Sequence, residues 1–273
     1  MLRTVLIGPK NFSFVQMLAH WLASRSKLTG AVWTDATAWN TSWTGRAKFT
    51  MRRLKRHGLI KVTDEVLFFL YYRSFLLRRD NRDVKKRIVE PYWATHERNY
   101  WTGDSIATDN VNSPAVLEFL TSLRADIVFT VCILNYFEEE IRAIPKLGVF
   151  LWHEGITPEY KGVYSAFWAI HNRDFGKVGY TLLKMNDVID GGEVFAQGPA
   201  VDIDYRRDGQ GYIAHKAIYD SLPDVERLLL ELEHGTAQPL DRSDRNPMYY
   251  TYPGLTDLIR QRFRLWMYFA AHF

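Results

Sequence analysis

The stretch that decides the fold is RTVLIGPKNFSFVQMLAHWLASRSKLTGAVWT, residues 3–34. Its short apolar run ends at Ile7 and is followed by Gly8-Pro9, which is typical of a buried strand that enters a tight loop. Apolar residues then recur at helix spacing from about Phe12 to Ser26, and Gly30-Ala31-Val32-Trp33 predicts a second strand. A strand, a helix and a strand in this order predict a right-handed parallel unit of an α/β fold.

The same alternation resumes in the middle of the chain. Residues 114–124 predict a helix, and Ile127 to Leu134 form a near-continuous apolar run, as expected of a strand that is buried on both faces. A short helix over Glu138–Ile144 and a strand over Val149–His153 follow. The loop from Gly8 to Asn11 lacks the later glycines of the dinucleotide fingerprint, so a Rossmann dinucleotide cofactor has little support.

The segment between these two parts is helical and strongly basic. Phe49–His57 and Asp64–Arg79 predict two amphipathic helices separated at Gly58, and Val84–Glu90 predicts a further turn or two before Pro91. Residues 46–98 hold 15 Lys and Arg against 6 Asp and Glu, a local charge of +9 in a chain whose total is +4. The segment therefore predicts a helical insertion over 35–103 that either contacts an anionic partner (phosphate, nucleic acid or a lipid surface) or is a solvated helical face.

Composition limits the class of protein. The 273 residues suffice for one large domain or two small ones, and 47% hydrophobic with 24% charged residues exclude a disordered tail, a collagen-like repeat and a coiled-coil rod. The single cysteine, Cys132, excludes an intramolecular disulfide and fits a reducing cytosol. The longest apolar stretch, Val66 to Tyr72, is far below the roughly 20 residues of a membrane span. These features predict a cytoplasmic protein.

Two titratable residues stand where chemistry is expected. His153 ends the apolar strand Val149–His153, and Asp190 lies in a glycine-rich turn after a strand predicted over Gly179–Met185. A carboxylate beside an imidazole fixes its tautomer and raises its basicity, which suits proton transfer from an amine. The alternative is that Asp190 is only a turn residue.

This part of the chain resembles the 10-formyltetrahydrofolate-dependent formyltransferase domain shared by methionyl-tRNA formyltransferase, glycinamide ribonucleotide transformylase and sugar N-formyltransferases. His153 matches the family's strand-end histidine, Thr157–Gly162 its following loop and Phe167–Ile170 the next helix. Met185–Val194 matches the turn that carries the family's aspartate, at Asp190. The likeness covers residues 1–34 and about 104–200.

The resemblance implies an α/β fold with a Rossmann-like, mostly parallel sheet and helices on both faces. It implies a catalytic domain over 1–200 that includes the helical insertion 35–103. Residues 201–273 are then a helical C-terminal extension.

One position departs from the family pattern. The family pairs an asparagine with the histidine two residues later, and Leu151 occupies the asparagine position here. Alternate residues of a strand share a face, so residues 151 and 153 belong to one site. In the family the amide donates a hydrogen bond to the formyl oxygen, and losing such a donor typically costs about 10²–10³ in rate. Asn135, Trp152 Nε1 or a main-chain N–H are the candidate replacements.

The resemblance implies that His153, oriented by Asp190, takes a proton from an acceptor amine that attacks the formyl group of 10-formyltetrahydrofolate. It implies no metal. The residues expected to bind the folate are Ile133, Leu134, Asn135, Tyr136, Asp187, Val188 and Ile189. Those expected to bind the acceptor are Lys10, Asn11, Tyr160, Lys161 and Gly162.

The acceptor is expected to be a small amine. Too few residues follow Thr236 for the C-terminal barrel of methionyl-tRNA formyltransferase, and Tyr249–Pro253 with Leu255–Arg264 resembles the tail of sugar N-formyltransferases. A nucleotide-linked amino sugar is therefore the first choice and a natural-product amine the second. The final apolar run, Phe263–Phe269, either closes the core or forms a homodimer contact.

Two other functions remain open from the sequence. The first is a catalytically impaired relative that binds folate or nucleotide without turnover, because of Leu151. The second is an RNA-binding protein that uses the basic helices of 46–98, with Trp93, Tyr100 and Trp101 as stacking residues.

Overall fold

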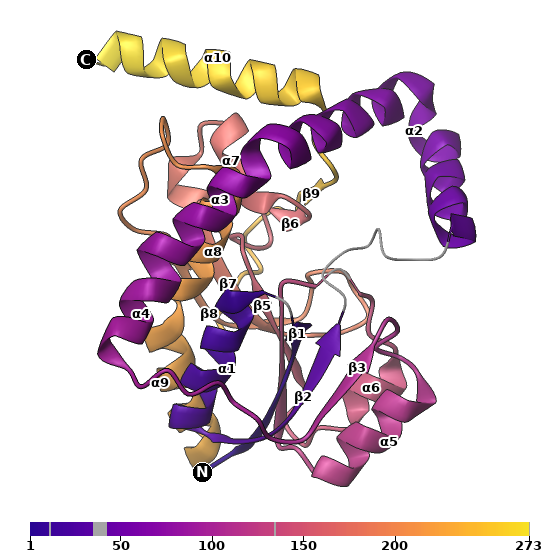
Figure 1. The fold of residues 1–273 in the computed structure, drawn as a ribbon, viewed down its shortest axis with the longest axis vertical. Coiled ribbons are helices and arrows are strands. Elements are labelled where there is room, and N and C mark those ends of the chain that lie inside the picture. Colours follow the sequence, from indigo (N-terminus) through magenta and orange to yellow (C-terminus); the bar gives the residue numbers. More distant parts are fainter. Residues whose placement is uncertain (11, 35–42, 134, 273) are drawn as a thin grey trace.

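The computed structural model describes residues 1–10, 12–34, 43–133 and 135–272. Its centre is a seven-stranded sheet in the order β3-β2-β1-β4-β5-β7-β8 (Figure 1). The strands are β1 (Arg3–Pro9), β2 (Lys27–Thr34), β3 (Ser105–Thr108), β4 (Ile127–Val131), β5 (Val149–His153), β7 (Gly179–Lys184) and β8 (Glu193–Pro199). β1 to β5 pair in parallel, whereas β7 and β8 are antiparallel to their neighbours. The predicted Rossmann-like, mostly parallel sheet is confirmed.

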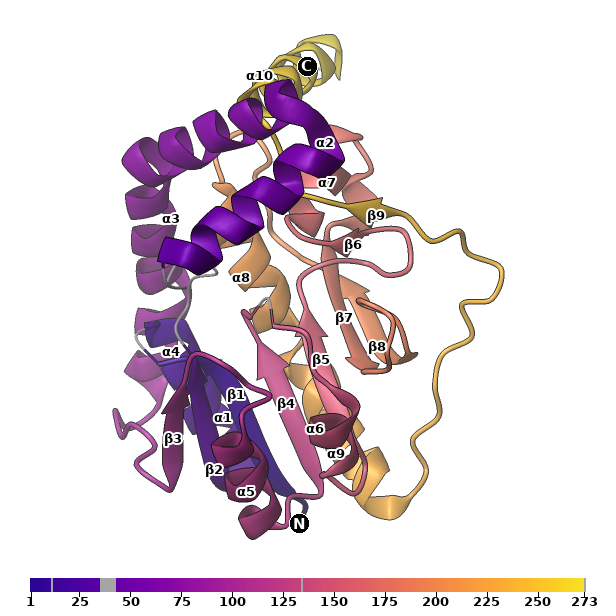
Figure 2. The same ribbon diagram turned by 90° about the vertical axis from the view of Figure 1, so that its right-hand side faces the viewer.

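Helices cover both faces of the sheet (Figures 1 and 2). α1 (Ser13–Arg25), α8 (Gln210–Asp220) and α9 (Leu222–His234) pack on one face, and α5 (Pro114–Leu123) and α6 (Glu139–Ala143) pack on the other. Strand residues alternate between the two cores because neighbouring side chains point to opposite faces. Phe129 and Phe150 join the α1–α8–α9 core, and Val128 and Val149 join the α5–α6 core.

The basic segment forms one long helical arm. It consists of α2 (Trp43–Tyr71), α3 (Leu77–Val84) and α4 (Glu90–Thr95), joined by π-helical turns over Tyr72–Leu76 and Lys85–Val89. Gly58 has φ 78° and ψ 164°, which confirms the predicted break between two helices. The predicted end before Pro91 is wrong, because Pro91 lies in the first turn of α4, where its missing N–H costs nothing.

The arm is anchored to the sheet domain by its second half. Val84, Ile88 and Val89 are buried in the α1–α8–α9 core. Asp80 is also buried, and its Oδ2 accepts hydrogen bonds from Tyr72 OH and from the main-chain N–H of Gly211 on α8.

The C-terminal part completes the fold. β6 (Lys161–Gly162) pairs in parallel with β9 (Tyr249–Tyr250), α7 (Ser165–His171) follows β6, and α10 (Leu255–His272) packs on α7 and α2. In α10, Leu258 and Leu265 are buried, whereas Phe263, Trp266 and Met267 are exposed. No helix in the described part of the chain is both long and apolar enough to cross a membrane.

Candidate functional site

His153 is the last residue of β5. The carboxyl end of β5 faces the segment that carries β6 and α7 (Figure 2). Phe150 and Trp152 point into the α1–α8–α9 core, so Leu151 and His153 belong to the opposite face. The Nε1–H of Trp152 donates to Ser221 Oγ at 2.5 Å inside the core. Trp152 is therefore not the replacement for the missing amide.

The imidazole of His153 is buried, and its hydrogen-bonding contacts with the described residues are made through one nitrogen, Nε2. Nε2 lies 3.2 Å from the carbonyl oxygen of Tyr160 and 3.2 Å from Ser165 Oγ. A carbonyl oxygen only accepts, so this contact requires the proton on Nε2 and places the lone pair of the neutral ring on Nδ1, which makes no hydrogen bond within the described part of the chain. Gly155 permits the arrangement, because a Cβ there would lie 2.9 Å from Nε2 and 2.4 Å from Ser165 Cβ.

Asp190 contacts the loop of residues 160–162, which also contacts His153. Its Oδ2 accepts a hydrogen bond from the main-chain N–H of Gly162 at 2.5 Å. The structure gives no hydrogen bond between Asp190 and His153; each side chain contacts the loop of residues 160–162 instead. The orientation of the imidazole by Asp190 therefore stays a prediction.

Glu154 is the functional candidate that the sequence reasoning missed. It follows His153 directly, and its Oε2 is buried without a hydrogen-bond partner. Burial raises the pKa of the Glu154 carboxyl to about 7; a protonated His153 lowers this pKa and the charge of Asp190 raises it. The charge of Glu154 also contributes to raising the pKa of Tyr164, after the larger effect of burial. An ionisable residue directly after a buried strand was the signal available in the sequence.

Two loops carry the residues expected to bind folate. In the loop after β4, Tyr136 is exposed, and its carbonyl oxygen accepts from Asn112 Nδ2 at 2.8 Å. In the loop after β7, Val188 and Ile189 are exposed, and Asn186 Oδ1 accepts from Val188 N–H at 2.9 Å. Both loops are therefore ordered by a side chain while their apolar residues face outward.

The other expected folate-binding residues differ in exposure. Ile133 packs partly against the α5–α6 core, and Asn135 and Asp187 are exposed. Leu134 lies outside the described residues.

The structure describes four of the five residues expected to bind the acceptor. Lys10 is exposed in the loop after β1, and Asn11 lies outside the described residues. The Tyr160 ring is buried, stacks on Tyr250 with centroids 5.2 Å apart, and its hydroxyl donates to Asp174 at 3.2 Å. Its side chain is thus structural, and only its carbonyl oxygen contacts the site.

Lys161 and Gly162 are half-buried in β6. Gly162 has φ 97°, and a Cβ there would lie 2.1 Å from the carbonyl oxygen of Tyr250. This position of the loop therefore requires glycine.

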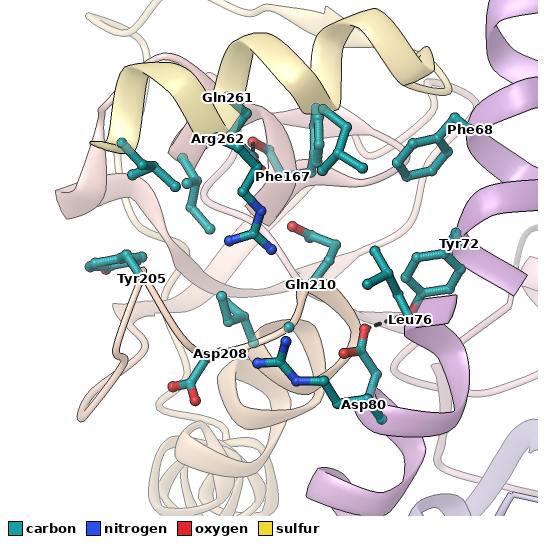
Figure 3. A pocket seen from close by; sticks show the side chains of 16 residues that line it. Phe68, Tyr72, Leu76, Asp80, Phe167, Tyr205, Asp208, Gln210, Gln261 and Arg262 are labelled. Carbon is teal, nitrogen blue, oxygen red and sulfur yellow. Dashed lines mark hydrogen bonds between the residues drawn. The ribbon is translucent and has the colours of Figure 1, made fainter. Parts of the chain in front are cut away.

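A small cavity away from His153 lies between α2, α3, α7, α8 and α10 (Figure 3). Its volume is about 20 Å³, enough for one water molecule. Asp80 and Arg262 project into it, and none of the predicted site residues lines it. Among the described residues, no group of three His, Cys, Asp or Glu side chains is placed to hold a metal ion.

Comparison with known proteins identifies relatives in sequence and in structure. No family model matches the chain. The chain is 28% identical over 152 residues to the bifunctional polymyxin resistance protein ArnA of Wigglesworthia glossinidia brevipalpis, a match that covers 54% of this chain and 23% of ArnA. The chain thus spans less than a quarter of the length of that relative.

Three solved structures share the fold. A sugar N-formyltransferase from Shewanella sp FDAARGOS_354 has a TM-score of 0.54 at 14% identity, covering 95% of this chain and 86% of its own. Glycinamide ribonucleotide transformylase 1 from Symbiobacterium toebii has a TM-score of 0.52 at 11% identity, covering 88% and 95%. The N-formyltransferase from Helicobacter canadensis, in complex with folinic acid and dTDP-3-aminofucose, has a TM-score of 0.51 at 14% identity, covering 92% and 71%.

At these identities the structural similarity establishes the fold. The chain has the formyltransferase fold, and the resemblance noted in the sequence is confirmed.

Proposed function

We propose that this chain transfers a formyl group from 10-formyltetrahydrofolate to the amine of a nucleotide-linked amino sugar. The observation that carries the proposal is His153, a buried imidazole at the end of β5 whose Nε2 is held by Tyr160 and whose Nδ1 makes no hydrogen bond to any residue that the structure describes. An unprotonated imidazole nitrogen at the carboxyl end of a central strand is suited to general base catalysis. The formyltransferase fold supplies the reaction class.

The residues fit a folate-type co-substrate. Tyr136, Val188 and Ile189 are exposed on two loops that Asn112 and Asn186 hold in place. Exposed apolar and aromatic side chains on ordered loops suit a flat heteroaromatic ring. The Helicobacter relative was solved with folinic acid and a dTDP-linked amino sugar, which supports this pair of ligands.

The folate supplies the formyl carbon. In the first step the acceptor amine forms a bond to that carbon, negative charge develops on the formyl oxygen, and His153 Nδ1 accepts the amine proton. In the second step the bond from the formyl carbon to the folate nitrogen breaks, and the proton held by His153 passes to that nitrogen. The products are a formamide and tetrahydrofolate, so His153 returns to its starting state.

Glu154 is our candidate for the donor that Leu151 cannot provide. With the pKa of its carboxyl near 7, a substantial fraction of Glu154 is protonated at neutral pH. A protonated carboxyl donates a hydrogen bond, and the buried Oε2 of Glu154 has no partner among the residues that the structure describes. We assign it the hydrogen bond to the formyl oxygen.

The test is tetrahydrofolate release from 10-formyltetrahydrofolate with a panel of dTDP- and UDP-linked amino sugars, alongside calorimetric titration of folinic acid. Formation of the formamide with any of these acceptors supports the proposal. Folate binding without turnover on the whole panel would favour the impaired relative that Leu151 suggests. If folinic acid does not bind, folate-dependent formyl transfer by this chain would be excluded.

A further inference from the structure

The arm and α10 expose several large apolar side chains. On the arm, the exposed large side chains recur at helix spacing from Leu59 and Ile60 through Leu67, Leu70 and Phe75. On α10 they recur as Ile259, Phe263, Trp266 and Met267. We call these residues together the apolar face.

The two helices are in contact. Lys61 Nζ on α2 is 2.8 Å from Asp257 Oδ2 on α10, and Asp64 accepts hydrogen bonds from the N–H and the hydroxyl of Thr256. Both views place α10 and α2 together at the end of the molecule opposite the N-terminus (Figures 1 and 2). The two exposed stripes therefore lie at the same end of the protein.

The exposed charge on these helices is positive. Six exposed basic side chains, which we call the basic rim, lie on the arm and on α10: Arg52, Lys55 and Arg56 on α2, Arg73 in the π-helical turn after it, Arg78 on α3 and Arg260 on α10. Three acidic residues of the same segments pair with other basic residues: Glu65 with Arg53, Asp257 with Lys61 and Asp83 with Arg79. Asp80 and Asp64 accept hydrogen bonds from the hydroxyls of Tyr72 and Thr256. Among the described residues, none of these carboxylates forms an ion pair with the six basic residues of the rim, so the rim remains positively charged.

We propose that the apolar face and its basic rim dock the protein onto an anionic lipid surface. Helices that lie in a membrane interface combine apolar and aromatic residues on one side with Lys and Arg along the border, where they meet acidic headgroups. Trp266 and Tyr71 are the kind of ring that settles at headgroup depth. The proposal concerns membrane binding and does not depend on the proposed chemistry.

The other possible partners fit this surface less well. In a symmetric dimer each copy presents the same patch to the other, so the positive rims would face each other. Nucleic acid would suit the basic side chains, but the branched aliphatic residues Ile60, Leu70 and Ile259 offer no stacking surface for bases. A lipid bilayer accommodates both the aliphatic residues and the charge.

The experiment is flotation of the full chain with vesicles of phosphatidylcholine alone and of equal parts phosphatidylcholine and phosphatidylglycerol. We expect binding to the anionic vesicles that weakens with added salt, and little binding to the neutral ones. The variant Ile60→Ser/Leu70→Ser/Trp266→Ser and the variant Arg52→Gln/Arg56→Gln/Arg78→Gln should each lower the affinity by roughly tenfold or more. Because all six residues are exposed, folding should be retained, which circular dichroism checks.

Matched controls lie elsewhere on the surface. Leu230→Ser on α9 removes an exposed leucine away from the apolar face, and Lys27→Gln removes an exposed positive charge. Both should bind the anionic vesicles as the wild type does.

Three results would overturn the proposal. The first is the absence of wild-type binding to anionic vesicles. The second is a dimer in light scattering that the serine variant converts to monomer while vesicle binding is unchanged. The third is binding to single-stranded RNA that the glutamine variant abolishes, with no difference between the two kinds of vesicle.

Discussion

The imidazole of His153 and the main chain of Tyr160 are in contact, with Nε2 3.2 Å from the carbonyl oxygen. This contact fixes the proton on Nε2 and separates the two roles of the ring: one nitrogen holds it in place, and the other is free to accept a proton. His153→Gln should separate these roles, because a glutamine amide can still donate to the Tyr160 carbonyl but is no base.

We therefore expect His153→Gln to lower kcat by about 10²–10⁴ while leaving the melting temperature near that of the wild type. The measurement is tetrahydrofolate release under saturating co-substrate, with His234→Gln, at an exposed position, as the control. Undiminished kcat in the His153 variant would remove the histidine from the mechanism.

Glu154 should impose a pH dependence on the rate. Its carboxyl has a pKa of about 7, and the proposed donor is the protonated form, so the contribution of Glu154 to kcat should fall as the pH rises through about 7. Glu154→Gln keeps a donor without an ionisation, so its profile should lack this decline. A decline that persists unchanged in the glutamine variant would assign it to another group.

The same ionisation should appear in stability, without any substrate. The folded-state pKa of Glu154 lies above its ordinary value of 4.5, so between about pH 4.5 and pH 7 the folded protein holds a proton that the unfolded chain has released. This contribution to stability is fully present below pH 4.5 and is lost as the pH rises through about 7, by up to about 3 kcal/mol. Urea denaturation at pH 5 and pH 8 should show a larger decrease for the wild type than for Glu154→Gln. Equal decreases would mean that Glu154 ionises freely in the folded protein.

Asp190 acts on the site by its charge and by its bond to the loop, and these effects can be distinguished. Asp190→Asn retains an oxygen that can accept from the N–H of Gly162, but it removes the negative charge that raises the pKa of Glu154. The decline in kcat should therefore move to lower pH, with little change in melting temperature. Asp190→Ala also removes the acceptor from the loop, so it should lower both kcat and thermal stability. An identical pH profile for wild type and Asp190→Asn would show that the charge does not reach Glu154.

The sequence predicted the parts of the fold that depend on local pattern. The apolar run Val149–His153 forms β5 with the predicted bounds, and Gly58 breaks the helix where expected. The continuation of the arm through Pro91 was not predicted, because packing of Ile88 and Val89 in the core holds these turns together. Here tertiary contacts outweigh the local propensity.

Only part of the site could be predicted from the sequence, because the rest depends on contacts between residues that are distant in the chain. His153 and Asp190 could be singled out from the positions that a strand and a turn give them. The environment of Glu154 comes from Asp190, Tyr72 and Tyr164, which are distant in sequence, so its raised pKa follows only from the fold. The buried ring of Tyr160 was likewise hidden, because its stacking partner, Tyr250, belongs to the C-terminal part.

The sharpest test of the proposed donor is a rescue experiment at Leu151. Glu154→Leu should lower kcat by about 10²–10³, because it removes the donor to the formyl oxygen. Leu151 is half-buried on the same face of β5 as His153, so an asparagine there would direct its amide to the same site. We expect Leu151→Asn to raise the kcat of the Glu154→Leu variant at least tenfold. The same substitution in the wild type should change kcat much less. Leu151→Val, which adds no donor, is the control. If the asparagine and the valine act alike in the Glu154→Leu background, the two positions do not share a function, and Glu154 is not the replacement for the missing amide.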